Sequence, residues 1–282
     1  MITTRSQRTA GRPPSRRAAQ ADRDKQWGTV LIVVMLLVFG GAAAGYLYVS
    51  STRPTIDRET ACPVDGPGAV TAVLFDRTDP FSEREQIFLE NWLTELRDST
   101  KRFEQISTYD LSDQGAQVIK PLLTVCNPGR GEDANPLYDS PVLREERWKK
   151  QFEGPVRQKM DTLRQGGGAK TSPLLEAVQS VSLQSFQRPK LERVPKKLVL
   201  ISDLLQYTKT LDFYKTVPPH STFRNGAEGI RLRTNLSNVA VKILFIPRAK
   251  PERIPGILQF WTEWFVDQGA SRDNFKIQWV EG

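Results

Sequence analysis

The stretch VTAVLFDRTDPFS, residues 70–82, joins a continuous apolar run to a cluster of side chains that carry oxygen. The run, which ends at Phe75, is typical of a strand buried on both faces of a parallel sheet. Two carboxylates, Asp76 and Asp79, and the hydroxyl of Thr78 follow it directly. These groups either cap the helix that comes next, or they form a site for a metal ion or a phosphate.

An uncharged segment, residues 27–49 (WGTVLIVVMLLVFGGAAAGYLYV), lies near the amino terminus. As a helix of 23 residues that rises about 1.5 Å per residue, it crosses a hydrocarbon core of about 30 Å. A cleaved signal peptide is the alternative, but its apolar core would be unusually long and would continue past Ala42–Ala44 to Val49. The segment therefore predicts a single transmembrane helix.

The two sides of this segment differ in charge. Residues 1–26 carry seven Lys or Arg against two Asp, and their composition is typical of a disordered tail. The positive-inside rule places this tail in the cytoplasm, and a linker at 50–68 and a domain at 69–282 on the far side. Without the tail the net charge of +8 falls to about +3, so the pI of 9.5 is no sign of nucleic-acid binding.

Both cysteines, Cys62 and Cys126, follow the predicted membrane segment. An even number in an exported region favours one structural disulfide, and two unrelated buried thiols are the alternative. Neither residue lies in a CxxC motif, so thiol redox catalysis is not expected. Topology and cysteine usage together predict a protein of the bacterial inner membrane whose domain lies in the periplasm.

Beyond residue 68, strand and helix patterns alternate. We expect strands at 69–76, 105–112, 120–126, 196–203, 238–247 and 275–280, and helices at 82–103, 140–165, within 165–186 and at 251–269. The turn-like residues 113–115 leave so short a connection that the second and third strands form an antiparallel pair. The whole order predicts an α/β fold with a mostly parallel sheet.

Asp76 and Asp203 each end a buried apolar run. In sheets of this kind, ligands bind outside the carboxyl ends of the strands, at the point where the strand order reverses. If these two strands are neighbours, both carboxylates point into one crevice. The glycine loop 166–168 could reach the same end of the sheet.

The element order over residues 69–280 resembles that of a von Willebrand factor type A domain. The resemblance implies a doubly wound, Rossmann-like sheet with helices on both faces. It also implies that the strand at 120–126 lies at the sheet edge, so that a bridge from Cys62 to Cys126 would tie the linker to that edge.

That family binds a metal ion through Asp-x-Ser-x-Ser after the first strand, a Thr from a second loop and an Asp after the fourth strand. Here DRTDP supplies Asp76 and Thr78, with Thr in place of the first Ser. GGGAKTS supplies Thr171 or Ser172, and LVLISD supplies Asp203. The resemblance thus implies a partly matched metal-ion-dependent adhesion site.

Pro80 departs from this motif, because it stands where the second Ser is expected and has no side-chain ligand. Asp79 could substitute for it. Hydroxyls and carboxylates with several waters suit Mg²⁺, and Mn²⁺ prefers similar ligands. The expected metal ligands are Asp76, Thr78, Thr171 and Asp203, with Asp79 and Ser172 in reserve. Helix capping and hydrogen-bonded strand ends are the alternative roles of these residues.

VLFDRTD also resembles the first motif of haloacid-dehalogenase-like phosphatases, in which the first Asp is a nucleophile that works with Mg²⁺. Ser202 would then supply the second-motif hydroxyl and Lys170 a charge partner. The further acidic pair that such a site needs is not apparent near a later strand end. The only histidine, His220, lies in a turn-rich segment where a surface position is expected.

No acid–base or nucleophilic constellation is apparent, so no catalytic residue is assigned and binding is favoured over catalysis. The domain is expected to dock another protein, periplasmic or membrane-bound, at the strand-end crevice. The long segment 207–233 adjoins that crevice. The aromatic residues of FWTEWF (260–265) are expected in the core.

Overall fold

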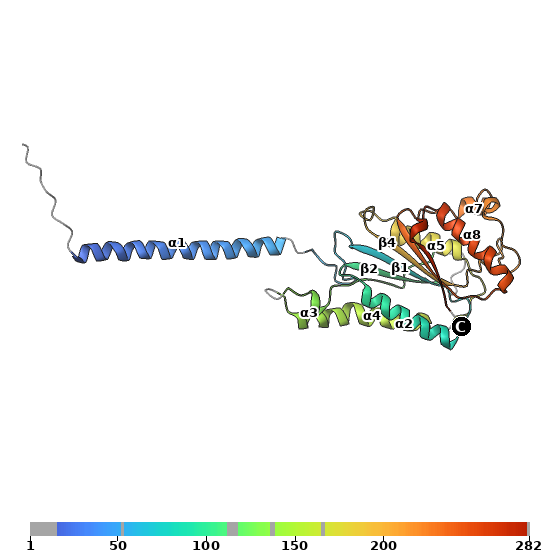
Figure 1. Ribbon diagram of the computed structural model, residues 1–282, viewed down its shortest axis with the longest axis horizontal. Coiled ribbons are helices and arrows are strands. Elements are labelled where there is room, and N and C mark those ends of the chain that lie inside the picture. The colour runs from blue at the N-terminus through green and yellow to red at the C-terminus, as the bar shows by residue number, and fades with distance from the viewer. Residues whose placement is uncertain (1–15, 52–53, 112–117, 136–138, 165–166, 281–282) are drawn as a thin grey trace, which may run out of the picture. The chain divides into compact units, whose positions relative to one another are not determined.

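A computed structural model describes residues 16–51, 54–111, 118–135, 139–164 and 167–280 (Figure 1). The chain divides into two compact units, Met1–Pro54 and Thr55–Gly282. The turn predicted at 113–115 lies outside the described residues. Both hydrophobic clusters of the described chain belong to the second unit.

In the described part of the chain, six strands form one sheet in the order β3-β2-β1-β4-β5-β6. The pair β2–β3 is antiparallel and the other neighbouring pairs are parallel. The strands are β1 (Ala69–Phe75), β2 (Glu104–Asp110), β3 (Leu123–Cys126), β4 (Lys196–Ser202), β5 (Val239–Phe245) and β6 (Phe275–Trp279). The strand order confirms the predicted α/β sheet, its antiparallel pair and the edge position of β3.

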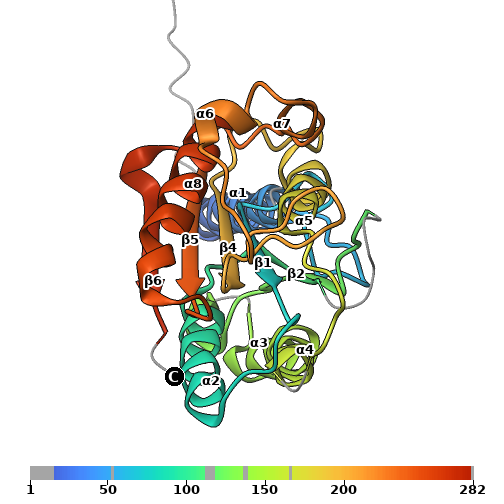
Figure 2. The same ribbon diagram turned by 90° about the vertical axis from the view of Figure 1, so that its right-hand side faces the viewer.

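Helices cover both faces of the sheet, as the end-on view shows (Figure 2). On one face lie α2 (Glu83–Ser99), α3 (Pro141–Trp148) and α4 (Gly154–Arg164). On the other lie α5 (Leu174–Val181) and α8 (Ile254–Asp267), with the short helices α6 (His220–Phe223) and α7 (Ala227–Arg231). This arrangement is the doubly wound architecture expected from the order of elements.

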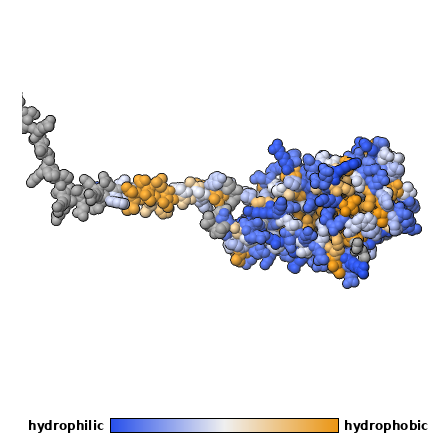
Figure 3. Space-filling model, viewed as in Figure 1, coloured by the Kyte–Doolittle hydropathy of each residue, from blue (hydrophilic) through white to orange (hydrophobic). Residues whose placement is uncertain are grey.

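Helix α1 (Arg16–Ser51) contains the predicted membrane segment. Its part Trp27–Ser51 is long and apolar enough to cross a membrane, and none of it is buried. The space-filling view shows this apolar band along the helix (Figure 3). The helix begins before Trp27, within the tail predicted to be disordered, because Ala18, Ala19 and the polar residues around them have good helix propensity.

Local sequence explains where two helices begin or change. Ser82 Oγ accepts a hydrogen bond from the Glu85 amide (3.3 Å), and Glu85 Oε2 accepts one from the Ser82 amide (2.8 Å), so these two residues form a capping box at the start of α2. Between α3 and α4 the chain is π-helical at Lys149–Glu153. Pro155 lacks the N–H that would continue a regular helix, so the irregular turn falls beside it.

The sheet divides the core into two clusters. Leu74 and Leu198 point to the side of α5 and α8, whereas their neighbours Val73 and Val199 point to the side of α2 and α4. Strands β1 and β4 are therefore apolar on both faces, which is why they read as unbroken apolar runs. The four aromatic side chains of residues 260–265 are at most 2% exposed, as predicted.

The surface position predicted for His220 is wrong. Its side chain is only 7% exposed, and its ring packs edge-on against Phe260 with 5.9 Å between the ring centroids. Burial lowers the pKa of the imidazole despite the nearby carboxylates of Asp267 and Glu263. The burial arises because α6 lies against α8, a contact between segments some forty residues apart that no local pattern indicates.

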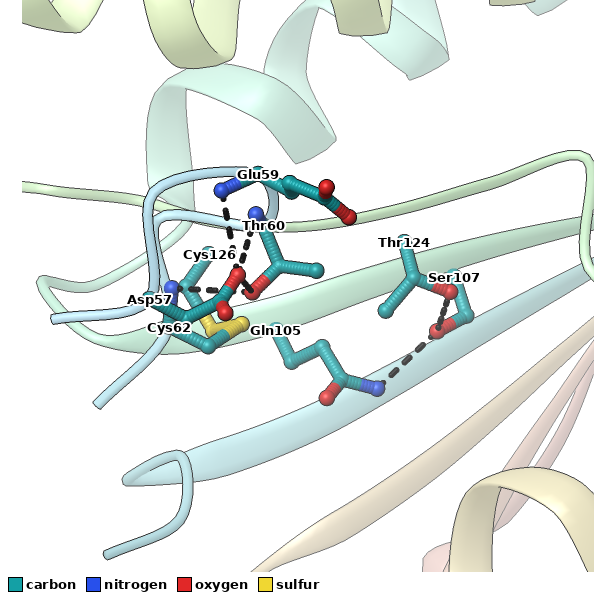
Figure 4. The surroundings of a disulfide bond; sticks show 8 residues. All are labelled: Asp57, Glu59, Thr60, Cys62, Gln105, Ser107, Thr124 and Cys126. Atoms are coloured by element: carbon teal, nitrogen blue, oxygen red, sulfur yellow. Dashed lines mark hydrogen bonds between the residues drawn. A yellow bond between two sulfur atoms is a disulfide. The ribbon is translucent and has the colours of Figure 1, made fainter. Parts of the chain in front are cut away.

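A disulfide joins Cys62 to Cys126, the last residue of edge strand β3 (Figure 4). The pairing confirms that the segment before β1 is tied to the sheet edge. That segment also folds back on itself, because the Val64 amide donates to the Thr55 carbonyl (2.8 Å) and the Asp57 amide donates to the Cys62 carbonyl (2.8 Å). The Cys126 amide donates to the Thr60 carbonyl (2.8 Å), which adds a second link to β3. The compact unit accordingly includes residues from Thr55 onward.

Candidate functional site

Strands β1 and β4 are direct neighbours and run in the same direction. Asp76 follows β1 and Asp203 follows β4, so both carboxylates lie at the carboxyl end of the sheet. Figure 2 looks onto this end, with β1 and β4 side by side near its centre. Beyond β1 the strand order runs to β2, and beyond β4 to β5, so the pair marks the point where the order reverses.

The Asp76 carboxylate is 4% exposed and is held by hydroxyl groups. Oδ1 accepts hydrogen bonds from the Thr78 hydroxyl (2.8 Å) and amide (3.1 Å). Oδ2 accepts one from the Ser202 hydroxyl (2.7 Å) and a longer one from the Ser172 hydroxyl (3.5 Å). A donating hydroxyl keeps its lone pairs, so these three oxygens remain available to a cation.

Asp203 is 6% exposed and is less well satisfied. Its Oδ1 accepts a hydrogen bond from the Leu205 amide (2.9 Å), but its Oδ2 is buried without a hydrogen-bond partner in the described chain. Leu204, which lies between Asp203 and Leu205, has a left-handed backbone with φ of 62°, and this turns the chain sharply after the strand. A buried carboxylate oxygen without a partner is costly and calls for an explanation.

The carboxyl groups of Asp76 and Asp203 both have a raised affinity for protons. Burial, followed by the negative charge of Asp76, raises the pKa of Asp203 to about 8. Burial also raises the pKa of Asp76, although the hydrogen bonds from Ser202 and Thr78 oppose the shift. A proton or a neighbouring positive charge would therefore stabilise the pair at neutral pH.

A small pocket opens between these groups. The volume that a water-sized species can occupy is about 10 Å³, which suits one water molecule or one ion and no larger ligand. The only basic side chain among the described residues that line it is Arg248, whose guanidinium forms two bonds of 2.7 Å to the Glu85 carboxylate. The charge of Arg248 is thus shared with Glu85. The pocket is lined by Asp76, Thr78, Asp79, Phe81, Ser202, Asp203, Ile246 and Arg248.

The glycine loop reaches this end of the sheet, as its position before α5 indicated. The Gly168 amide donates to the Arg77 carbonyl (2.9 Å), and a Cβ added to Gly167 would lie 1.9 Å from that same oxygen. Only glycine permits this approach. From this loop it is Ser172, and not Thr171, that forms a hydrogen bond to Asp76 in the described chain.

The remaining predicted residues take part to different degrees. Thr78 and Asp79 line the pocket, and the charge of Asp79 contributes to the raised pKa of Asp203. Pro80 is exposed and lies outside the pocket lining, so the second hydroxyl of the motif has no counterpart there. The helix-capping alternative is met by Ser82 alone, which leaves Asp79 free for the pocket.

The donor set fits a small divalent cation. Five of the eight residues that line the pocket carry carboxylate or hydroxyl oxygens, the ligands that Mg²⁺ and Mn²⁺ favour. One of these residues, Asp203, has an Oδ2 that is buried without a partner in the described chain. Within the described residues, no group of three or more His, Cys, Asp or Glu side chains is arranged to enclose a metal ion. An ion here would therefore depend on hydroxyls, water or a ligand from outside.

Sequence reasoning missed two parts of the site. Ser202 was considered only for phosphatase chemistry, yet its hydroxyl bridges Asp76 and the Leu204 amide (2.8 Å). Tyr214, 45% exposed, lies near enough that burial and then the charges of Asp203 and Asp79 raise its pKa. Tyr207 packs edge-on against Tyr214 with 5.7 Å between the centroids. The long segment after Asp203 was the available signal for both tyrosines.

The sequence matches no protein-family model and no curated protein. Among solved structures, the SpRpn10 VWA domain aligns over 75% of this chain and 87% of its own, with 14% identity and a TM-score of 0.42. The conserved hypothetical protein BatB from Bacteroides thetaiotaomicron aligns over 76% and 91%, with 8% identity and a TM-score of 0.36. An aerotolerance-related membrane protein from Bacteroides fragilis aligns over 75% and 91%, with 10% identity and a TM-score of 0.35.

The von Willebrand factor type A-like fold of this chain follows from its own strand order and directions. An antiparallel edge strand, β3, precedes a run of five parallel strands, and β1 and β4 meet at the centre with an aspartate after each. This is the arrangement that the sequence resemblance implied.

Proposed function

We propose that the domain is a membrane-tethered protein-binding module that docks another protein at the pocket between Asp76 and Asp203. The unpartnered Oδ2 of Asp203 carries this proposal. It is a buried acceptor on a residue that lines a pocket with room for about one ion or water, at the end of the sheet where α/β folds bind ligands. A cation completed by a group from the partner would satisfy it.

Mg²⁺ or Mn²⁺ is the cofactor that these oxygens would hold. Asp76, Thr78 and Asp203 would contribute most, with the hydroxyls of Ser172 and Ser202 beside them. A bound cation would supply positive charge to two buried carboxylates and a position for a carboxylate of the partner. The residues of this chain would orient it, because Asp76 is already fixed by its hydroxyl donors.

Binding is favoured over phosphoester hydrolysis by the size of the pocket. A volume of about 10 Å³ suits one ion or water better than a phosphorylated substrate beside Asp76. The carboxylate that would have to attack is 4% exposed, and both of its oxygens already accept hydrogen bonds. A phosphatase would show turnover of a generic phosphoester that requires Mg²⁺ and is lost in Asp76→Asn.

The rim of the pocket offers a surface for a protein partner. Tyr207 and Tyr214 are 39% and 45% exposed and form an aromatic pair. Tyrosine provides large, rigid contact area at protein interfaces with little loss of side-chain entropy. The exposed Lys209 and Lys215 on the same segment would favour an acidic partner.

The charge distribution around α1 supports the proposed location. The basic residues before Trp27 would stay in the cytoplasm, and the domain after Ser51 would lie in the periplasm of a Gram-negative bacterium. A disulfide between Cys62 and Cys126 fits an oxidising compartment. The partner would then be periplasmic or membrane-bound.

Photo-crosslinking tests this function. The full chain is expressed in its own host membrane with a photo-crosslinking side chain at position 214. We expect a discrete protein adduct that disappears in Asp203→Asn and after removal of divalent ions. The control places the same crosslinker at Val142, which is 67% exposed on α3 and outside the pocket lining. An adduct that persists unchanged in Asp203→Asn would show that the pocket is not the docking site.

Calorimetric titration of Mg²⁺ and Mn²⁺ into the full chain tests metal binding independently of partner binding. We expect saturable binding that is lost in Asp203→Asn, because this change removes the unpartnered carboxylate oxygen. Docking without measurable metal binding would mean that the partner meets the rim alone.

A further inference from the structure

Residues 187–197 (QRPKLERVPKK) are rich in basic side chains. They follow the π-helical turn Ser182–Phe186 after α5 and include the first two residues of β4. They hold five basic residues and one acidic residue, Glu192. Arg188, Lys190, Arg193 and Lys197 are exposed, and Lys196 is half-buried. Among the described residues, none of the five forms an ion pair. This basic loop therefore presents uncompensated positive charge.

The basic loop lies at the amino end of the parallel strands, opposite the candidate site. Its last residues begin β4, and the Val70 amide at the start of β1 donates to the Pro195 carbonyl (2.9 Å). The exposed Lys101 and Arg102, just before β2, add positive charge to the same end. With Asn235 and Ser237 before β5, the loop also borders an open hollow of about 380 Å³, lined in part by Arg188, Glu192 and Lys196.

The chain between the candidate membrane span and the domain is short in sequence. The candidate membrane span ends at Ser51, and the compact unit begins at Thr55. Four Cα-to-Cα steps cover at most about 15 Å. The Thr55 carbonyl accepts a hydrogen bond from the Val64 amide (2.8 Å), and Lys190 Nζ in turn donates to the Val64 carbonyl (3.5 Å). The basic loop is thus connected to the tether through Val64.

We propose that the basic loop 187–197 binds the anionic headgroups of the bilayer that α1 crosses. A cluster of Lys and Arg next to a membrane span gains attraction from anionic lipids within about one Debye length, roughly 8–10 Å. The acidic residues beside the tether, Asp57, Glu59 and Asp65, oppose this attraction. Asp57 is partly satisfied internally, because its Oδ1 accepts three hydrogen bonds from Glu59 and Thr60.

This contact would orient the domain. Because the basic loop and the candidate site lie at opposite ends of the same parallel strands, headgroup binding at one end directs the pocket of Asp76 and Asp203 away from the lipid. The basic loop thus has a role that is independent of the pocket's ligand.

Hydrogen exchange of the full chain in lipid nanodiscs tests the proposal. One set of discs contains phosphatidylcholine alone, and the other contains added phosphatidylglycerol. We expect the amides of 187–197 to exchange about tenfold more slowly in the anionic discs, and this protection to fade at high salt. Equal exchange in the two lipids would overturn the proposal.

Two charge-matched variants sharpen the test. Arg188→Glu/Lys190→Glu/Lys197→Glu should abolish the protection. Lys170→Glu/Lys209→Glu/Lys215→Glu changes three exposed lysines at the other end of the sheet by the same total charge and should retain it. Loss of protection in both variants would point to net charge and overturn the assignment to this loop. Protection by inorganic phosphate in neutral discs would indicate a site for a free anion and overturn the lipid assignment.

Discussion

The two ends of the parallel strands handle charge in opposite ways. At the carboxyl end, Asp76 and Asp203 are at most 6% exposed around a pocket for one ion. At the amino end, the basic loop 187–197 leaves its charges in solvent and without ion pairs in the described chain. In the described chain, the strands therefore carry a buried carboxylate oxygen without a hydrogen-bond partner at one end and exposed basic side chains without ion pairs at the other.

The difference shows how cost and function are related. Burial raises the pKa values of the two carboxyl groups, so without a cation the fold is expected to lose stability as the pH rises. Exposed lysines and arginines cost the fold almost nothing, because water and salt screen them. The pocket can therefore be recognised from the unfavourable burial of two carboxylates. The basic loop can be recognised only from its composition and its position in the fold.

The largest expected effect concerns the disulfide at the amino end. Cys62→Ser/Cys126→Ser removes a crosslink that spans 64 residues, and the loop-entropy account predicts a loss of about 4 kcal/mol in the free energy of unfolding. Denaturant titration with and without a reductant measures it. The wild type should lose stability on reduction and the double variant should not respond. Equal midpoints for both proteins would show that the packing of 55–64 holds this end by itself.

A smaller and pH-dependent effect is expected at the pocket. In metal-free protein, Asp203→Asn should raise the free energy of unfolding by about 1–3 kcal/mol at pH 9 and change it little at pH 5. The pKa of Asp203 is raised to about 8 in the fold from the ordinary value of 3.8, so the native state binds the extra proton between these values. Wild-type stability is therefore lost as the pH rises through this window. Thermal unfolding across the range measures it, with Asp212→Asn, a half-buried aspartate paired with Lys215, as the control.

A wild-type stability that stays level between pH 5 and 9 in metal-free protein would contradict this expectation. It would mean that water reaches the two carboxylates and relieves their burial.

The smallest expected effect is at the basic loop. Arg188→Glu/Lys190→Glu/Lys197→Glu should change the free energy of unfolding by less than about 0.5 kcal/mol, because none of the three side chains is buried. Denaturant titration of the full chain in detergent measures this change. A loss well above that value would assign the loop a structural role and would remove the contrast between the two ends.

Sequence patterns predicted the strands that pack in the core and left the short helices undefined. The runs that form β1, β4 and β5 are mostly apolar on both faces, so a stretch of consecutive apolar residues is enough to predict their burial. The helices α6 and α7 are short, and each lies in contact with a distant helix: α6 with α8, and α7 with α5 through the bond from Arg231 to Glu176 (2.7 Å). Their formation depends on these contacts, which is why His220 appeared to belong to the surface.

By itself, the sequence determined the apolar span, the order of strands and helices, the even pair of cysteines and the aspartates that end two buried runs. Each of these is a property of neighbouring residues. Only the tertiary structure decided that β1 and β4 are adjacent, that Ser172 rather than Thr171 bonds to Asp76, and that Ser202 joins them. Strand order and side-chain direction depend on packing between distant segments, and so does the space of one ion that remains between the two carboxylates.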